Sequence, residues 1–138
     1  MPQLTVGLVS CSKPKLGRSA PAQDLYLSPL FRLSRQVCEQ RFDRWAILSA
    51  KFGLVMPDQV VEPYDVTLSR LPAARRRVWA RDVEHTIKAT WTETAVFHVF
   101  AGRHYLKAVA ALRHVDELQG LGIGHRLQRL NEMLRAGP

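Results

Sequence analysis

Cysteine is scarce in this sequence, which has only Cys11 and Cys38 among its 138 residues. Two thiols are too few for the disulfide scaffold of a small secreted protein, and they lack the spacing of metal ligands. Long hydrophobic runs are missing as well, and residues 95–101 fall far short of the about 20 residues that span a bilayer. No basic stretch followed by an apolar signal core opens the chain. These absences favour a reducing, cytoplasmic setting and no membrane partner.

Acidic residues are also few, with 12 Asp and Glu against 20 Lys and Arg, a formal charge of +8 and a pI near 10.2. A basic surface attracts nucleic acid or a phosphate-bearing small molecule, although the charge could also serve solubility alone. Hydrophobic residues make up 46% of the chain, enough for the core of one α/β domain spanning residues 1–138.

Three short apolar segments predict buried strands: residues 4–10, 45–50 and 95–101. None alternates strictly between polar and apolar positions, as expected for a parallel sheet covered on both faces. A weaker signal at residues 115–118 indicates a fourth strand.

The segments between these strands have the apolar periodicity of helices. Ser28 and Pro29 begin one helix and Pro72 opens a second, while apolar residues recur at helical spacing near residues 106–110 and 123–134. Alternating strands and helices predict a small three-layer αβα sandwich with a mainly parallel sheet of three to four strands. Two connections, residues 11–27 and 51–71, are unusually long and leave from the carboxyl edge of the sheet, where ligands bind in open α/β folds.

The first strand ends in Ser10, Cys11, Ser12 and Lys13. Such a turn can present hydroxyls, backbone N–H groups and an ammonium to a phosphate, but it can equally be a polar turn with solvated lysines. Cys11 is either a nucleophile activated by nearby positive charge or a small residue fitted to a tight strand end. The lack of a local base favours the second interpretation.

The second strand ends at Ser49, followed by Lys51 and Gly53, and Gly53 suggests a left-handed or close-approach backbone. Two prolines stiffen the loop beyond it and hold Tyr64 and Asp65 in place. Asp65 is the best acid–base candidate, and the alternative is a cap or a salt bridge to Arg70.

The third strand leads into Gly102, Arg103 and Tyr105 at the start of a helix. Glycine allows close approach, arginine binds anions in a bidentate manner, and tyrosine offers a ring or a phenol, unless this is an ordinary exposed first turn. His98 is expected to be a core histidine. The other histidines form no pair at metal spacing, so we predict neither a metal nor a cofactor.

The three strand ends together form the main argument for a site. Parallel strands place their carboxyl ends on one edge of the sheet, so we expect Lys13, Lys51 and Arg103 to surround the opening of one binding cleft. The glycines of residues 120–124 could bring the last helix close to it, although a turn between helices explains them equally well.

A second basic feature is an arginine face on the helix that follows Pro72, made of Arg75, Arg76, Arg77 and Arg81. It could contact nucleic-acid phosphates, or it could be a solvated helix surface.

The segments SCSKPK, DLYLSPLF, LSAKFGLVMPD, EPYDVTL and GLGIGHRL resemble a largely uncharacterised family of small bacterial and phage domains, distantly similar to the YaaA-like peroxide-stress proteins. The resemblance covers nearly the whole chain. It implies an α/β domain with a cleft at the SCSK and SAK turns and an association with DNA or nucleobase chemistry.

We therefore expect an enzyme acting on a nucleotide or nucleic acid, at the N-glycosidic bond of a nucleobase. Lys13, Lys51 and Arg103 would hold phosphate, Asp65 would orient water, and Tyr64 or Tyr105 would stack on the base, with Cys11 a further catalytic candidate. The remaining expected substrate contacts are Ser10, Ser12, Ser49, Gly53 and Gly102. The alternatives are a non-enzymatic DNA- or RNA-binding domain that uses the arginine face, and an accessory subunit; the sequence sets no oligomeric state.

Overall fold

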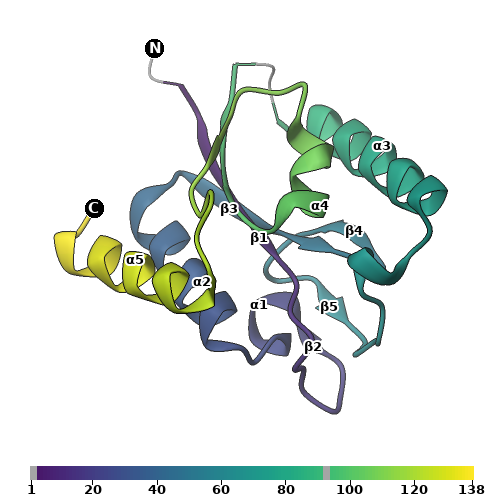
Figure 1. Cartoon of the computed structure of the whole chain (residues 1–138), viewed down its shortest axis with the longest axis horizontal. Helices are drawn as coiled ribbons and strands as arrows, with labels where there is room; N and C mark the ends of the chain where they lie inside the picture. Colours follow the sequence, from purple (N-terminus) through teal and green to yellow (C-terminus); the bar gives the residue numbers. More distant parts are fainter. Residues whose placement is uncertain (1–2, 92–93) are drawn as a thin grey trace.

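The computed structural model describes residues 3–91 and 94–138 (Figure 1). The elements follow one another as β1 (Thr5–Ser10), β2 (Ala20–Pro21), α1 (Ala22–Leu25), α2 (Pro29–Arg41), β3 (Arg44–Ser49), β4 (Gly53–Val55), β5 (Val60–Val61), η1 (Leu68–Arg70), α3 (Ala73–Thr90), β6 (Val96–Phe100), α4 (Arg103–Leu106), η2 (Lys107–Val109), β7 (His114–Asp116) and α5 (Ile123–Ala136). In this part of the chain, no helix is long and apolar enough to cross a membrane.

The main sheet has five strands in the order β4-β3-β1-β6-β7. β1 pairs in parallel with β3 and β6, and β6 pairs in parallel with β7, so the predicted mixed α/β class with a mainly parallel sheet is confirmed. The strand count exceeds the predicted three to four because β4 lies inside the segment read as a loop. Gly53 has φ +75°, and this left-handed conformation folds the chain back so that β4 runs antiparallel to β3.

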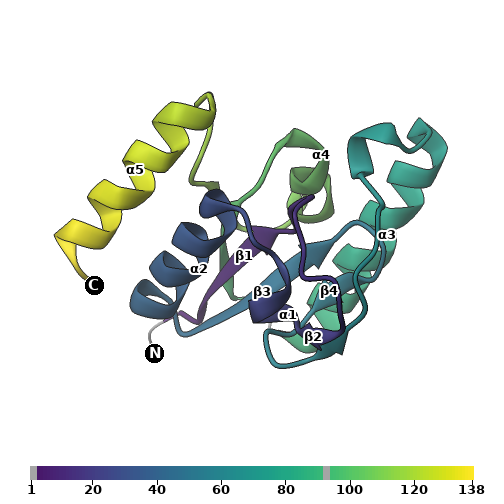
Figure 2. The same cartoon turned by 90° about the horizontal axis from the view of Figure 1, so that it is seen from below.

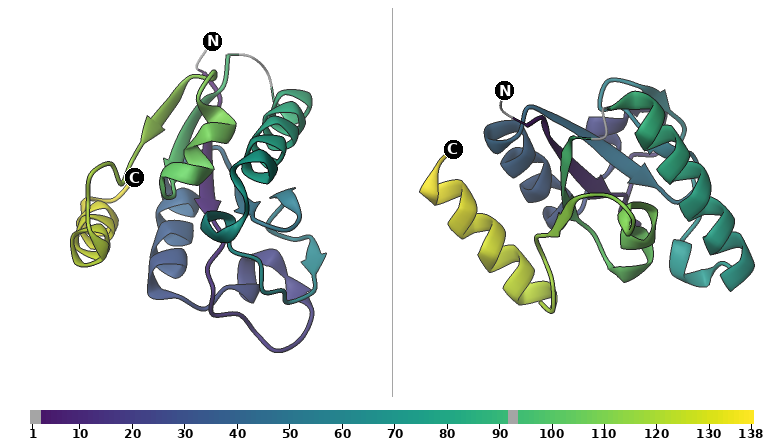
Figure 3. Two further views of the ribbon diagram at one scale, coloured as in Figure 1. Left: turned by 45° about the vertical axis from the view of Figure 1, so that its right-hand side comes forward. Right: turned by 90° about the horizontal axis from the view of Figure 1, so that it is seen from above.

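Apolar side chains alternate between the two faces of the sheet. Val6 and Leu8 pack into one core cluster with Val83 and Ile87 of α3, whereas Val9 packs into the other cluster. The second cluster includes Phe31, Val37 and Cys38 from α2 and Leu130 from α5. Helices therefore cover both faces, with α2 and α5 on one side and α3 on the other (Figures 2 and 3).

Gly7 sets how closely α2 approaches the sheet. A Cβ atom built on Gly7 would collide with Cys38 Sγ and would lie 3.0 Å from Phe42 Cδ2. Glycine at this position of β1 lets α2 pack directly against the strand backbone.

The two long connections at the carboxyl edge are folded rather than irregular. β2 pairs antiparallel with β5, and the backbone N–H groups of Ala22 and Gln23 donate to the carbonyls of Gln59 (2.8 Å) and Pro57 (2.9 Å). These contacts fix each connection against the other in the lower part of Figure 1. Short pairs of strands without an apolar repeat leave no periodic signal, which explains why the sequence indicated loops.

The helix boundaries follow local chemistry. Ser28 caps α2, its hydroxyl accepting a hydrogen bond from the Phe31 N–H at 3.1 Å, as predicted. Pro72 precedes α3 as the capping residue. The apolar spacing near residues 106–110 belongs to the short α4 and the 3₁₀ turn η2 rather than to one long helix.

Candidate functional site

A cleft of about 280 Å³ opens where the chain leaves β1. It is lined by Cys11, Ser12, Lys13, Lys15, Val66, Thr67, Ser69, Arg70 and Tyr105, and we call it the Cys11 cleft. Its walls come from the segment after β1, from the segment around η1 and from α4. The position agrees with the predicted location at the carboxyl edge of the sheet.

Cys11 lines this cleft and is half-buried. Its backbone N–H donates to the Leu48 carbonyl at 2.9 Å and so extends the ladder between β1 and β3. Its Sγ atom is 3.4 Å from the Tyr105 hydroxyl and also accepts a hydrogen bond of 3.4 Å from the Ala50 N–H. The Tyr105 hydroxyl and the Ala50 N–H thus both lie within hydrogen-bonding distance of the sulfur.

Lys15 forms one wall, and its ammonium lies against aromatic rings. The Nζ atom is 4.4 Å from the centroid of the Tyr64 ring and 5.8 Å from that of Tyr26. Burial lowers the pKa of Lys15, while the neighbouring Cys11 and Asp65 act in the opposite direction. The rings favour the ammonium form, but the loss of hydration is the larger effect.

Behind Lys15, three hydroxyls form a chain that joins β3 to the two connections. Ser49 Oγ donates to Tyr64 Oη at 2.7 Å, and the Tyr64 and Tyr26 hydroxyls share a hydrogen bond of 2.6 Å. Ser49 Oγ also accepts from the Phe52 N–H at 3.0 Å. Burial raises the pKa of Tyr26 to about 12 and raises that of Tyr64 further, so both phenols are neutral donors at physiological pH.

On the other side of the cleft, Tyr105 is held by Trp79. The two rings meet edge to face with centroids 5.4 Å apart, and Trp79 Nε1 donates to the Ser49 carbonyl at 2.8 Å. Burial, followed by the nearby Cys11, raises the pKa of Tyr105 well above its ordinary value. Its O–H group is therefore a neutral proton donor that faces the Cys11 sulfur.

Within residues 3–91 and 94–138, the cleft is lined by three cationic side chains, Lys13, Lys15 and Arg70, and by no carboxylate. Lys13 and Arg70 are exposed, as is the nearby Asp65, which carries the charge that acts on Lys15. A cleft with this balance attracts an anion and leaves room for a small organic group beside it.

The structure brings together only some of the predicted site residues. Lys13 lines the cleft, but Lys51 and Arg103 do not. The turn into β4 takes Lys51 and Gly53 to a separate cavity of about 360 Å³, where Lys51 Nζ lies 5.2 Å from the Phe52 ring centroid. Arg103 is exposed at the start of α4, after Gly102.

The serines after β1 face partly in another direction. Ser10, Cys11 and Ser12 line a small space of about 30 Å³, roughly one water molecule, together with Ser28, which caps α2, and Ser34 within that helix. Within the described residues, the buried Ser34 Oγ has no hydrogen-bond partner.

Six residues that line or support the cleft were not among the candidates predicted from the sequence: Lys15, Tyr26, Val66, Thr67, Ser69 and Arg70. The SCSKPK and DLYLSPLF segments contain two of them, and a lysine and a tyrosine in motif-like turns were available signals. Thr67, Ser69 and Arg70 reach the cleft through η1, which no periodicity predicted.

The arginine face is less uniform than expected. Arg75, Arg77 and Arg81 are exposed on α3, and Arg81 Nε is 3.6 Å from the Asp82 carboxylate. Arg76 is half-buried, and its guanidinium donates to the Leu71 carbonyl, so it holds the entry of α3. Three of the four arginines therefore remain open to solvent.

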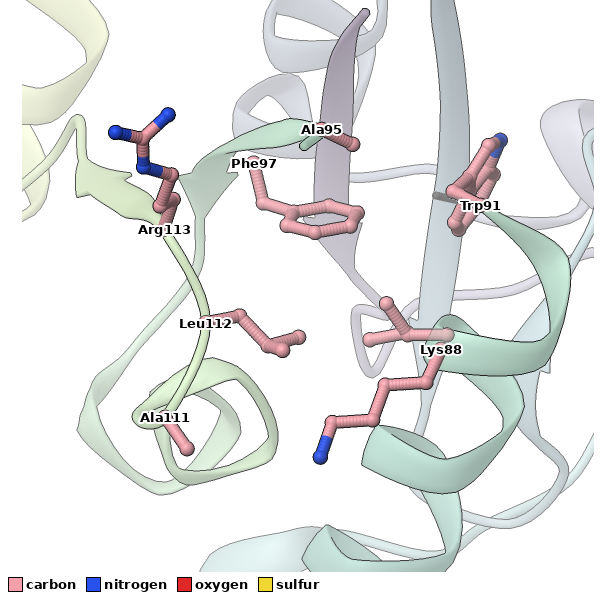
Figure 4. Close-up of a pocket in the computed structure, with 8 residues that line it drawn as sticks. Lys88, Trp91, Ala95, Phe97, Ala111, Leu112 and Arg113 are labelled. Carbon is pink, nitrogen blue, oxygen red and sulfur yellow. The ribbon is translucent and has the colours of Figure 1, made fainter. Parts of the chain in front are cut away.

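Another cavity, of about 390 Å³, lies at the amino end of β6 (Figure 4). Trp91, Phe97 and Leu112 form apolar walls, and the Arg113 guanidinium points away from the cavity. Among the residues that the structure describes, those that line it include no carboxylate, thiol, hydroxyl or imidazole. The Cys11 cleft is therefore the stronger candidate for chemistry.

His98 has the structural role that the sequence predicted. Its Nδ1 lies 2.8 Å from the Glu117 carboxylate, and its ring stacks on Phe42 with centroids 4.3 Å apart. Within residues 3–91 and 94–138, no three histidine, cysteine or acidic side chains converge as a metal site.

Comparison with known proteins identifies a family but no activity. Residues 6–132 match the model of a family of unknown function, DUF6884. The uncharacterized protein YfjM of Bacillus subtilis (strain 168) is 39% identical over 67 residues, an alignment that covers 44% of this chain and 45% of that protein. No solved structure matches the chain. Because the family match covers nearly all of its length, the chain belongs to the DUF6884 family of unknown function.

Proposed function

We propose that the protein is an enzyme directed at nucleotides or nucleic acid, and that the Cys11 cleft binds its phosphate-bearing substrate. One observation supports this most strongly: Lys13, Lys15 and Arg70 converge on a single cleft at the carboxyl edge of a parallel sheet. Three cations with no lining carboxylate suit a phosphate, and the hydroxyls of Thr67 and Ser69 add neutral donors.

The reaction we propose is cleavage of an N-glycosidic bond. In this scheme Lys13 and Arg70 hold the phosphate, and the exposed Asp65 orients water at the sugar or stabilises its developing positive charge. The Tyr105 hydroxyl, kept protonated by burial, donates to the departing base. Lys51 and Arg103 have no role in this scheme: Lys51 lies at a separate cavity and Arg103 is exposed at the start of α4, whereas the charge of Asp65 acts on Lys15 in the cleft.

The proposed scaffold is a three-layer αβα arrangement with a distant relationship to the YaaA-like proteins. The SCSKPK segment supplies Cys11, Lys13 and Lys15, and the EPYDVTL segment supplies Tyr64 and Thr67. Two of the segments that carry the resemblance thus line or support the cleft.

Binding of AMP tests the proposal most directly. Isotope-labelled protein is titrated with AMP, adenosine and inorganic phosphate while backbone amide resonances are followed. We expect shifts at residues 11–15 and 66–70, and weaker binding of adenosine than of AMP because it lacks the phosphate. Arg70→Gln should weaken AMP binding, whereas Arg103→Gln removes an exposed cation outside the cleft and should not. Equal effects of the two substitutions, or an absence of AMP binding, would contradict the proposal.

A second candidate function is non-enzymatic binding of DNA or RNA, favoured by the three exposed arginines of α3. Fluorescence anisotropy with duplex DNA, single-stranded DNA and RNA at two salt concentrations separates the two functions. Loss of polymer binding in Arg77→Glu or Arg81→Glu, with no loss in Arg70→Gln, would support the binding surface. The reverse pattern supports the cleft.

A further inference from the structure

The primary amine of Lys15 has an unusual place among the cations of the cleft. It is half-buried, whereas Lys13 and Arg70 are exposed. Its Nζ donates to the Lys13 carbonyl at 3.3 Å and otherwise lies against the rings of Tyr64 and Tyr26. It forms no ion pair with any residue that the structure describes. A lysine that bound only by charge would gain more from full exposure.

This environment favours an amine that loses its proton readily. Burial lowers the pKa of Lys15, and Lys13 adds to the effect; the charges of Cys11 and Asp65 oppose it without cancelling it. A lysine freed from its proton in this way is a nucleophile toward carbonyl carbon. The aromatic walls keep water away from the nitrogen on one side and leave its other side open to the cleft.

From this placement we propose that Lys15 Nζ forms an imine with the aldehyde carbon of an open-chain pentose phosphate. The inference rests on the proposed function, because cleavage of an N-glycosidic bond in a nucleotide leaves such a sugar phosphate. Lys13 and Arg70 are the phosphate ligands, and Lys15 is the nucleophile.

The step balances without any further reactant. The Nζ lone pair attacks the aldehyde carbon, and the carbonyl π electrons move to oxygen, which takes up a proton. The nitrogen then loses a proton to give the neutral carbinolamine, and its freed lone pair forms the C=N bond while the C–O bond breaks. The oxygen leaves with a second proton as water, and nitrogen releases its remaining excess proton. These protons are exchanged with water, and the charge of Asp65, which acts to raise the pKa of Lys15, favours the positively charged nitrogen along this path.

Cys11 is the competing nucleophile in the cleft, and its product differs chemically. A thiol adds to an aldehyde to give a hemithioacetal without loss of water, and cyanoborohydride does not reduce that adduct to a stable bond. An imine is reduced to a secondary amine that survives digestion. Reductive trapping therefore reports on Lys15 and not on Cys11.

The experiment incubates the folded protein with ribose 5-phosphate and sodium cyanoborohydride and measures adducts by intact mass and peptide mapping. We expect one dominant early adduct on Lys15, slower trapping of ribose than of ribose 5-phosphate, and loss of the adduct in Lys15→Arg. Arginine keeps the positive charge but is not a nucleophile. Lys13→Arg is the matched control in the same segment and should still be trapped.

The outcomes separate this inference from the proposed function. Adducts spread over exposed lysines, or an unchanged adduct level in Lys15→Arg, overturn the imine even when AMP binds. A Lys15 adduct in a protein that does not bind AMP upholds the imine and contradicts the nucleotide substrate. A third arm with AMP in place of ribose 5-phosphate shows whether the sugar phosphate arises from a nucleotide: a Lys15 adduct there supports both proposals.

Discussion

Ser49 Oγ donates a hydrogen bond to Tyr64 Oη across 2.7 Å, from the last residue of β3 to the segment that follows β5. Ser49 is fully buried, and the same oxygen accepts from the Phe52 N–H, so one hydroxyl closes the turn after β3 and anchors Tyr64. Tyr64 in turn supports Lys15 through its ring. The geometry of the Cys11 cleft therefore depends on a residue that does not line it.

Substituting Tyr64 with phenylalanine should destabilise the fold by about 1–2 kcal/mol. The change keeps the ring but removes the acceptor of the buried Ser49 O–H and the hydrogen-bond partner of the Tyr26 hydroxyl, while Ser49 Oγ still accepts from the Phe52 N–H. Urea unfolding of Tyr64→Phe against the parent chain measures the effect. The double variant with Ser49→Ala should cost less than the sum of the two single changes, because the lost hydrogen bond is then counted once. Strict additivity would show that the 2.7 Å contact contributes nothing to stability.

The two cysteines should differ sharply in reactivity. Cys11 is half-buried in an open cleft beside two hydrogen-bond donors, whereas Cys38 is fully buried and burial raises its pKa well above the usual range. Iodoacetamide should therefore modify the native protein once, at Cys11, and reach Cys38 only after denaturation. Tyr105→Phe should slow the reaction, since it removes the O–H donor 3.4 Å from the sulfur. Peptide mapping checks both points, and early labelling of Cys38 would contradict them.

The strands could be predicted from sequence because burial and short apolar runs determine them directly. The segment at residues 45–50 matches β3, and the expected strand at residues 115–118 begins one residue early as β7. β4 escaped detection because three residues carry no periodicity, and its pairing depends on the positive φ of Gly53.

The sequence indicated at which edge of the sheet a cleft would lie, but not which residues would line it. Polar residues after β1 do line a cleft, at the carboxyl edge that parallel strands share. Lys51 was misplaced because the hairpin into β4 carries it to another cavity. Arg70 and Lys15 enter the cleft through tertiary packing of the two connections, which local sequence patterns do not report.

Gly53 should tolerate alanine poorly. Its φ of +75° lies in the left-handed region, and an added Cβ would also lie 3.4 Å from Val83. We expect Gly53→Ala to cost about 1–2 kcal/mol in the free energy of unfolding. Gly124→Ala is the matched control, because a Cβ there has no atom within 4 Å and α5 gains a better helix former. Equal losses in chemical denaturation would argue against strain at Gly53.

Gly7 makes a second test of packing, on the face covered by α2. Gly7→Ala should destabilise the fold by about 1–3 kcal/mol, because the new methyl group collides with Cys38 Sγ. Cys38→Ala removes that sulfur, so it should cost less in the Gly7→Ala background than in the parent chain. Thermal unfolding of the four proteins of this cycle measures the coupling. An unchanged cost of Cys38→Ala would mean that Phe42, 3.0 Å from the added atom, is the obstacle instead.

The carboxylate of Glu117, which follows β7, links this segment to β6 and α5. It accepts a hydrogen bond from His98 Nδ1 in β6 at 2.8 Å and contacts Arg129 of α5 at 3.4 Å, while its side chain is 11% exposed. These contacts lower its pKa below the ordinary 4.5, the His98 hydrogen bond being the largest cause.

Stability should therefore depend on pH through Glu117, and the direction follows from the lowered pKa. The pKa of Glu117 is lower in the folded chain than the value of 4.5 in the unfolded chain, so folding favours the carboxylate form. The stabilisation of the fold by this carboxylate is therefore complete above pH 4.5 and is lost as the pH falls through the pKa of the folded chain. Glu117→Gln should cost about 1 kcal/mol in urea unfolding at about pH 7 and progressively less toward about pH 3. Glu132→Gln, an exposed carboxylate on the same helix as Arg129, should stay within about 0.5 kcal/mol of the parent. A cost of Glu117→Gln that did not shrink in acid would place its origin in packing of the amide rather than in the charge.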